Sequence, residues 1–172
     1  MASSPTKNGE YLACGLPLII NAGIGDSDAL IDQWQAGVLI EEFIEGREFT
    51  IGVFKTKGEI ITLPVTEVKS KKEFFDFEAK YKGMSEEITP AEADPAVIEK
   101  VQAAARKIYS VLNCSGVVRI DFIYNEEKGQ PYMLEVNSVP GQSAASIVPQ
   151  QVKAMGWTLE KFYTALIEEC WN

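Results

Sequence analysis

Two short apolar segments in the second half of the chain carry polar side chains at every second position. Arg119 and Asp121 alternate with apolar residues in the first segment, and Glu135 and Asn137 do so in the second. Because the side chains of a β-strand point to opposite faces in turn, this alternation predicts two strands, each with one polar and one apolar face. The turn-rich stretch 125–130 joins the segments. We therefore expect a hairpin that gathers the four polar side chains on one face.

The alternation determines the face of this hairpin but leaves its register open. Pairing Asp121 with Glu135 places Arg119 opposite Asn137, whereas a slip of two residues keeps the face and changes the partners. Two carboxylates and an amide are hard oxygen ligands suited to Mg²⁺, which is commonly held by one or two carboxylates plus substrate phosphates. Two such ions could neutralise a transferring phosphoryl group. The alternative is an exposed polar face on which Arg119 makes ordinary cross-strand ion pairs.

Composition excludes several classes of function. The 172 residues include no histidine, which excludes a histidine general base, a histidine-dependent triad and a histidine-ligated zinc site. The formal charge of -9 opposes binding to nucleic acid, and no basic stripe appears. No apolar run approaches the ~20 residues needed to cross a bilayer, and the first residues lack the order of a secretion signal. We expect neither nucleic acid nor membrane as a partner, reduced cysteines and a cytoplasmic location.

The pattern of helices and strands changes near residue 38. Before it, short apolar strands alternate with helices, as in a small α/β unit, with helices expected over 5–13 and 27–35 and strands over 16–20 and 38–43. The glycine-rich turn 21–26 either presents backbone N–H groups to an anion or merely permits a tight connection. From residue 38 onwards, longer strands of antiparallel character are expected over 38–43, 47–55 and 60–68.

The remaining elements are predicted from capping and periodicity. Residues 69–92 read as a long charged loop. Asp94 and Pro95 open the clearest helix, with an apolar stripe that continues to Leu112. After the hairpin, a turn at 140–142 precedes a helix over 146–155, and Thr158 caps a last helix. These elements predict an α+β fold, mainly an antiparallel sheet with flanking helices, preceded by the short α/β unit.

Two further segments allow both a functional and a structural interpretation. Residues 74–81 combine aromatic rings with Lys80, a composition suited to a lid that closes over a phosphate and excludes water. The rings could instead simply anchor a surface loop to the core. Glu41, Glu42 and Glu48 fit alternating solvent and core positions, although a carboxylate at a strand edge could hold a ribose hydroxyl.

Four segments, taken in order, resemble the C-terminal half of D-alanine–D-alanine ligases. They are VLIEEFIEGRE at 38–48, FDFEAKY at 75–81, GVVRID at 116–121 and LEVNSVPG at 134–141. The resemblance runs from about residue 38 to the end and implies the ATP-grasp fold, whose ligases join a carboxylate to an amine through an acyl phosphate. It also implies ATP and Mg²⁺ as cofactors, D-alanine or a similar amino acid as substrate, and a role in peptidoglycan biosynthesis.

The resemblance also implies roles for individual residues. The adenine and ribose pocket would be lined by Glu41, Glu42, Ile44 and Glu48. Lys80 would contact the terminal phosphate from a mobile loop that Tyr81 supports. The two magnesium ions would be held by Asp121, Glu135 and Asn137.

The same likeness assigns the reaction and the second substrate. Arg119 and the Gly141 backbone would stabilise the tetrahedral adduct, which agrees with the need of an oxyanion for a cation and backbone donors. Ser146 and Ile147 would position the incoming D-alanine.

The chain departs from this family ahead of residue 38. Residues 5–43 resemble part of the nucleotide-binding half of a GT-B glycosyltransferase, in the segments 5–17 and 23–28, with Glu10 as a candidate ribose contact. We therefore expect two parts, 1–37 and 38–172. The substrate-binding domain and the grasping subdomain of the ligases are not recognised, so we expect a ligase that is weak or inactive alone; the alternative is a non-catalytic chimeric module. A homodimer that covers exposed sheet is also expected.

Overall fold

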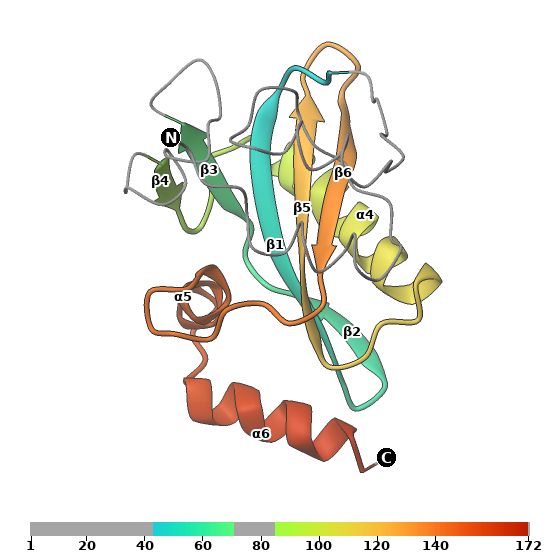
Figure 1. Cartoon of the computed structure of the whole chain (residues 1–172), viewed down its shortest axis with the longest axis vertical. Coiled ribbons are helices and arrows are strands. Elements are labelled where there is room, and N and C mark those ends of the chain that lie inside the picture. Colours follow the sequence, from blue (N-terminus) through green and yellow to red (C-terminus); the bar gives the residue numbers. More distant parts are fainter. Residues whose placement is uncertain (1–42, 71–84, 172) are drawn as a thin grey trace, which may run out of the picture. The chain divides into compact units, whose positions relative to one another are not determined.

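β1 is the central strand of an antiparallel sheet in this computed structural model, which describes residues 43–70 and 85–171 (Figure 1). The sheet has the order β4-β3-β1-β5-β6, and β2 pairs with the end of β1. Each of these pairings is antiparallel. The strands are β1 (Arg47–Thr56), β2 (Glu59–Thr62), β3 (Thr66–Ser70), β4 (Ser85–Ile88), β5 (Val117–Asn125) and β6 (Gln130–Asn137). The helices are α4 (Pro95–Val111), α5 (Ile147–Ala154) and α6 (Leu159–Glu169).

α4 covers one face of this sheet. Its buried residues Val101, Ala105 and Tyr109 pack against apolar side chains of the sheet that include Ile51 and Ile120, and Figure 1 shows the helix running behind β5 and β6. Asp94 begins the helix as expected, because its carboxylate accepts a hydrogen bond from the Ala96 backbone N–H at 2.8 Å. The apolar stripe and its cap therefore fix which face of the sheet is inside.

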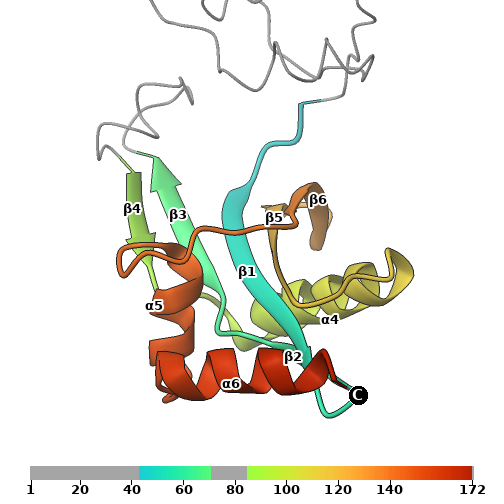
Figure 2. The ribbon, with the colours of Figure 1, turned by 60° about the horizontal axis from the view of Figure 1, so that its bottom comes forward.

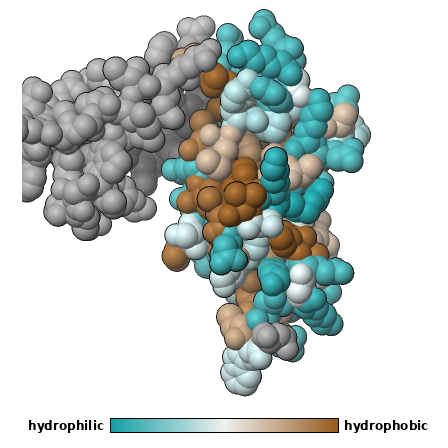
Figure 3. Space-filling model, turned by 90° about the vertical axis from the view of Figure 1, so that its right-hand side faces the viewer, coloured by the Kyte–Doolittle hydropathy of each residue, from teal (hydrophilic) through white to brown (hydrophobic). Residues whose placement is uncertain are grey.

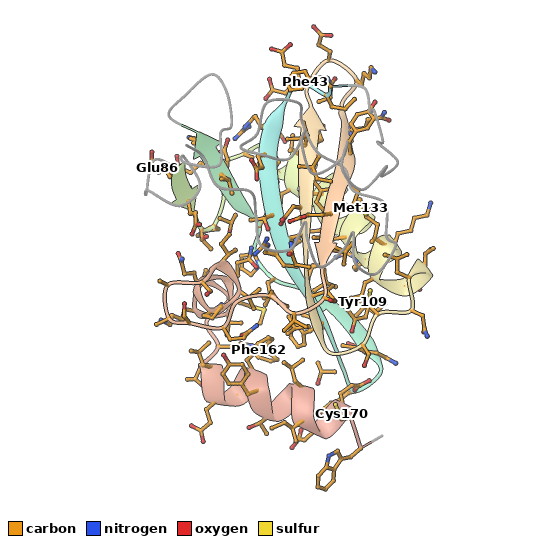
Figure 4. All side chains as sticks on the ribbon, viewed as in Figure 1. Phe43, Glu86, Tyr109, Met133, Phe162 and Cys170 are labelled. Atoms are coloured by element: carbon orange, nitrogen blue, oxygen red, sulfur yellow. The ribbon has the colours of Figure 1, made fainter. Side chains whose placement is uncertain are left out.

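α5 and α6 pack against the opposite face, near the β1–β2 hairpin (Figure 2). Phe54 of β1 points to this face and forms an edge-to-face pair with Phe162 of α6, with ring centroids 5.1 Å apart. Phe162, labelled in Figure 4, is completely buried together with Leu63 and Val152. Thr158 caps α6 as expected, since its side chain accepts from the Lys161 N–H. The rest of this face of β1 and β5 carries the candidate site.

β6 forms one edge of the described sheet. Figure 3 looks onto the side that bears β6 and α4, where apolar side chains lie among polar ones. Met133 and Leu134 of β6 are about half exposed, at 49% and 52%. An exposed strand edge can pair with another chain, and pairing of two copies remains a prediction.

Two expected elements are wrong. The strand expected over 60–68 is divided into β2 and β3, because residues 63–65 belong to neither strand and separate the two pairings with β1. Pro64 lies in this break and has no N–H to donate. The loop expected over 69–92 contains β4, which pairs with β3.

The remaining expectations either lie outside the described residues or can be compared with the structure directly. The helices and strands expected before residue 38 lie outside them, and of the strand expected over 38–43 only Phe43 is described, outside any strand. The helix expected over 146–155 is confirmed as α5. None of the helices in the described part of the chain is long and apolar enough to span a membrane.

Replacing Asp94 tests the capping of α4. We expect Asp94→Ala to lower the free energy of unfolding by about 1 kcal/mol, because the Ala96 N–H loses its acceptor. Asp94→Asn should remain close to the parent, since asparagine caps about as well. Urea unfolding followed by circular dichroism measures both; equal stability of the Ala variant and the parent would contradict the cap.

Candidate metal and phosphate site

The β5–β6 hairpin places its polar residues in one of the two registers left open by the sequence. Asp121 pairs with Glu135, and Arg119 pairs with Asn137. A register shift follows at once, because Phe122 pairs with Met133 rather than with the next residue along β6. Such bulges re-aim side chains and are frequent beside functional sites. The predicted shared face is therefore confirmed, and a bulge bounds it on one side.

Asp121 is the buried centre of this face, with an exposed fraction of 6%. The Arg119 guanidinium makes a bidentate pair with it: Nε donates to Oδ1 and Nη2 donates to Oδ2, each at 2.9 Å. The hydroxyl of Thr50, its partner on β1, donates to Oδ1. Asn137 Nδ2 donates to Oδ2 at 3.2 Å. Four donated hydrogen bonds from three strands thus converge on one carboxylate.

These contacts keep Asp121 ionised. Burial by itself raises the pKa of this carboxyl, but the hydrogen bonds from Arg119 and Thr50 and the charge of Arg119 outweigh it, so that the pKa lies below the ordinary aspartate value. The hydrogen bond with Asp121 correspondingly raises the pKa of Arg119. A charged carboxylate is the form that a divalent cation requires.

Glu135 and Asn137 are the other two candidate oxygen ligands. The Glu135 side chain is 57% exposed, and its Oε1 accepts a hydrogen bond from Asn137 Nδ2 at 3.0 Å. A half rotation of the Asn137 amide would turn Oδ1 towards a cation between the two carboxylates. The described residues hold no cluster of three or more His, Cys, Asp or Glu that could hold a metal ion, and the Asn137 amide is the candidate for a third ligand beside the two carboxylates. Two carboxylates and an amide fit Mg²⁺, which leaves its other positions to phosphate and water.

A second group of expected residues meets where α5 begins. Ser146 occupies the N-cap position and Ile147 is the first helical residue. A Cβ placed on Gly141 would lie 2.8 Å from Ser146 Oγ, so glycine permits this close approach. Ser146 Oγ shares a hydrogen bond of 2.8 Å with Ser143 Oγ and makes no capping bond. Gly141, Ser146 and Ile147 are therefore neighbours, as expected.

Only some of the residues expected to bind the nucleotide belong to the described part of the chain. Glu48 lies on β1 two residues before Thr50, and strand alternation puts it on the face that carries Asp121. Ile44 precedes β1 and is partly buried. Four of the expected residues lie outside the described part of the chain: Glu41, Glu42, Lys80 and Tyr81.

Sequence analysis missed two buried residues, one at this site and one behind it. Thr50 is 1% exposed and donates to Asp121, and Gln151 is completely buried and bonds to the β1 backbone at Thr50 and Gly52. The alternation of the segment 47–54 already puts Thr50 on one face with Glu48. Gln151 interrupts the apolar stripe formed by Val148 and Val152, and a polar residue in such a stripe is a signal of a buried hydrogen-bonding role.

The fold matches those of known proteins. Solved structures that superpose on the chain include the VanG D-Ala:D-Ser ligase from Enterococcus faecalis, with a TM-score of 0.68 and 30% identity over 91% of this chain and 46% of that one. A D-alanine–D-alanine ligase from Bacillus anthracis complexed with ATP gives a TM-score of 0.63 and 32% identity over 84% of this chain and 48% of that one. The fold is the C-terminal half of an ATP-grasp ligase.

Sequence comparison defines the family. The family described as "D-ala D-ala ligase C-terminus" matches residues 27–168, and the chain belongs to it. A D-alanine–D-alanine ligase of Azobacteroides pseudotrichonymphae genomovar. CFP2 is 43% identical over 171 residues, which is 90% of this chain and 52% of that relative. The corresponding ligase of Flavobacterium johnsoniae is 46% identical over 131 residues, covering 76% and 40%. The chain thus spans about half the length of these curated relatives.

The matched region begins before the boundary expected at residue 38. Residues 27–37 fall within the family match, and the alignment with the Azobacteroides ligase takes in 90% of this chain. The likeness of residues 5–43 to a glycosyltransferase finds no support in these relatives.

Replacing Asp121 tests the electrostatics of the site through stability. In metal-free buffer at pH 7, we expect Asp121→Asn to lower the free energy of unfolding by about 2 to 3 kcal/mol, because Arg119 loses its buried counter-charge. The pKa of Asp121 is lowered in the fold, so the stabilisation is fully present above the ordinary value of about 3.9 and is lost as pH falls through the lower folded value. Denaturant unfolding between pH 7 and pH 3 measures the difference.

A matched control is Glu126→Gln in the exposed hairpin turn, which should change stability by less than about 0.5 kcal/mol. Equal stability of parent and Asp121→Asn at pH 7 would contradict the ion pair. A difference in unfolding free energy between the parent and Asp121→Asn that stays constant from pH 7 to pH 3 would also contradict it.

Proposed function

We propose that this chain provides the magnesium, phosphate and acceptor sites of an ATP-dependent carboxylate–amine ligase of the D-alanine–D-alanine type. The observation that carries the proposal is the convergence of Asp121, Glu135 and Asn137 beside Arg119 on one sheet face. Membership of the ligase family and the ATP complex of the Bacillus anthracis relative support it. The proposed partners are ATP, Mg²⁺ and D-alanine or a similar amino acid.

Asp121, Glu135 and Asn137 would hold Mg²⁺ against the phosphates of ATP. When bound, the metal neutralises negative charge on the phosphate oxygens. Glu48, on the same face of β1 as Thr50, would hold a ribose hydroxyl. The family resemblance suggests that Ile44, Glu41 and Glu42 line the rest of the nucleotide pocket and that Lys80, supported by Tyr81, contacts the terminal phosphate; of these residues only Ile44 is described.

Arg119 is suited to a second task besides holding Asp121. Nε and Nη2 donate to Asp121, and these two bonds within the described residues leave Nη1 unused. The side chain is 20% exposed, so Nη1 can donate to a substrate oxyanion. In an acyl transfer, the amine nitrogen attacks the carbonyl carbon of the acyl phosphate and negative charge develops on the carbonyl oxygen. The C–O bond to the phosphate then breaks, inorganic phosphate leaves, and the amine nitrogen loses a proton. A fixed guanidinium and the Gly141 N–H would stabilise that charge.

The start of α5 would bind the acceptor amino acid. Ser146 has a hydroxyl that is not used in capping, and the N–H groups of Ile147 and Val148, at the first two helical positions ahead of Pro149, favour a carboxylate. Ile147 supplies a partly buried apolar contact. Gly141 lies close to this end of α5, so the acceptor and the oxyanion would be neighbours.

The activity is tested by measuring ADP and D-alanyl-D-alanine formed from Mg-ATP and D-alanine. The full chain is assayed alone and mixed with the N-terminal half of the Flavobacterium relative, because this chain spans 40% of that protein's length. We expect dipeptide in at least the mixture. Absence of dipeptide in both, with no binding of Mg-ATP by calorimetry, would contradict the proposal and favour a non-catalytic module.

Glu135→Gln separates the metal site from general folding. We expect it to reduce product formation about 100-fold, since loss of a metal ligand should cost at least as much as loss of a residue that supports one. Glu126→Gln, at the other end of the same hairpin, should retain the parent rate. Equal rates for the two variants would show that Glu135 is not a ligand.

A further inference from the structure

Gln151 fastens α5 to the central strand through hydrogen bonds that are entirely buried. Its Oε1 accepts from the Gly52 N–H at 2.8 Å, and its Nε2 donates to the Thr50 carbonyl at 3.0 Å and to Thr66 Oγ1 at 2.9 Å. Both polar atoms of the amide are therefore satisfied although the side chain has no exposure. A buried polar group that is fully satisfied fixes a unique geometry, because any displacement leaves donors or acceptors unpaired.

This amide fills a gap in the ladder of β1. β3 pairs with residues 48–50 of β1 and β2 pairs with residues 53–56, so the backbone between them needs other partners on that side. Gln151 supplies the bond for the Gly52 N–H, and the Leu63 N–H donates to the Gly52 carbonyl at 2.9 Å. A Cβ on Gly52 would lie 3.0 Å from Gln151 Oε1 and 2.6 Å from a Leu63 methyl. The glycine thus allows the helix side chain to reach the strand.

The same part of β1 faces the candidate metal ligand on its other side. Thr50 pairs with Asp121 and Gly52 pairs with Arg119. The Thr50 hydroxyl and Arg119 Nε both donate to Asp121 Oδ1, whereas Oδ2 accepts from Arg119 Nη2 and from Asn137 Nδ2, which also donates to Glu135 Oε1. Thr50 therefore bonds to the carboxylate oxygen that Asn137 does not contact, and together with Arg119 it orients the carboxylate.

We propose that Thr50 and Gln151 are positioning residues, which hold the Asp121 carboxylate in the orientation that presents Oδ2 to the metal and tie it to the helix that begins at the acceptor site. Thr50 acts on Asp121 directly, and Gln151 acts by holding the Thr50 peptide. α5 begins at Ile147, about one turn before Gln151. The hydrogen bonds of Gln151 therefore join β1, whose Thr50 contacts Asp121, to the helix that begins at the proposed acceptor site. This inference rests on the proposed metal site.

Removing the Thr50 hydroxyl tests the inference by metal affinity rather than by turnover. Mn²⁺ is titrated into the full chain, and free Mn²⁺ is measured by electron paramagnetic resonance, with and without a non-hydrolysable ATP analogue. We expect Thr50→Val to weaken Mn²⁺ binding about tenfold, as loss of residues that orient metal ligands typically does. Gln151→Met should weaken it in the same direction, and Thr50→Ser, which keeps the hydroxyl, should bind like the parent.

Tyr109→Phe is the matched control for loss of a buried hydroxyl. Tyr109 is 2% exposed and donates to the Gly116 carbonyl at 2.8 Å on the α4 side of the sheet. The variant should melt at a lower temperature and bind Mn²⁺ like the parent. Thermal melts of all variants identify any that fail to fold. If Thr50→Val does not fold, Gln151→Met decides, because a folded Gln151→Met that binds Mn²⁺ within twofold of the parent would overturn the inference.

The outcomes separate this inference from the proposed function. If the parent chain binds no Mn²⁺ in either condition, the proposed metal site fails and the inference fails with it. If the parent binds and a folded Thr50→Val binds within twofold of it, the inference alone is overturned. A tenfold loss in Thr50→Ser would also overturn it, because the hydroxyl would then not be the cause.

Discussion

The buried carboxylate of Asp121 is the interaction on which the rest of the site depends. A charge removed from water is tolerated only when it is paired and fully hydrogen-bonded, and here Arg119, Thr50 and Asn137 supply those bonds. The donors come from β1, β5 and β6, so the requirement fixes how the three strands meet. Arg119 holds both oxygens of the carboxylate, Thr50 adds a bond to Oδ1, and Asn137 connects Oδ2 to Glu135. Stability and the proposed metal binding thus depend on the same contacts.

Local patterns in the sequence predicted a large part of this arrangement. The alternation around Asp121 and Glu135 gave the correct face, because strand geometry leaves a side chain only two directions. Asp94 and Thr158 marked the starts of α4 and α6 correctly, since a capping side chain bonds to N–H groups two or three residues away. The register itself stayed open in the sequence, because both pairings satisfy the same alternation; the structure has Asp121 opposite Glu135.

Features that depend on distant partners were missed. β2 and β3 read as one strand because Pro64 alone does not show that β1 accepts them at separate places. β4 was hidden in a charged stretch, since its pairing with β3 is not visible in its own sequence. Thr50 and Gln151 lie far from Asp121 along the chain, and their roles follow only from the packing of α5 on β1.

The central claim is that Asp121, Glu135 and Asn137 form one divalent-metal site on this face of the sheet. The most direct test is a crystal structure of the full chain grown with Mn²⁺ and a non-hydrolysable ATP analogue, with Mn²⁺ located by its anomalous scattering. The account predicts at least one Mn²⁺ peak within about 2.3 Å of oxygens of Asp121, Glu135 and Asn137, with phosphate oxygens completing the coordination. A nucleotide bound with its metal away from these three side chains would contradict it.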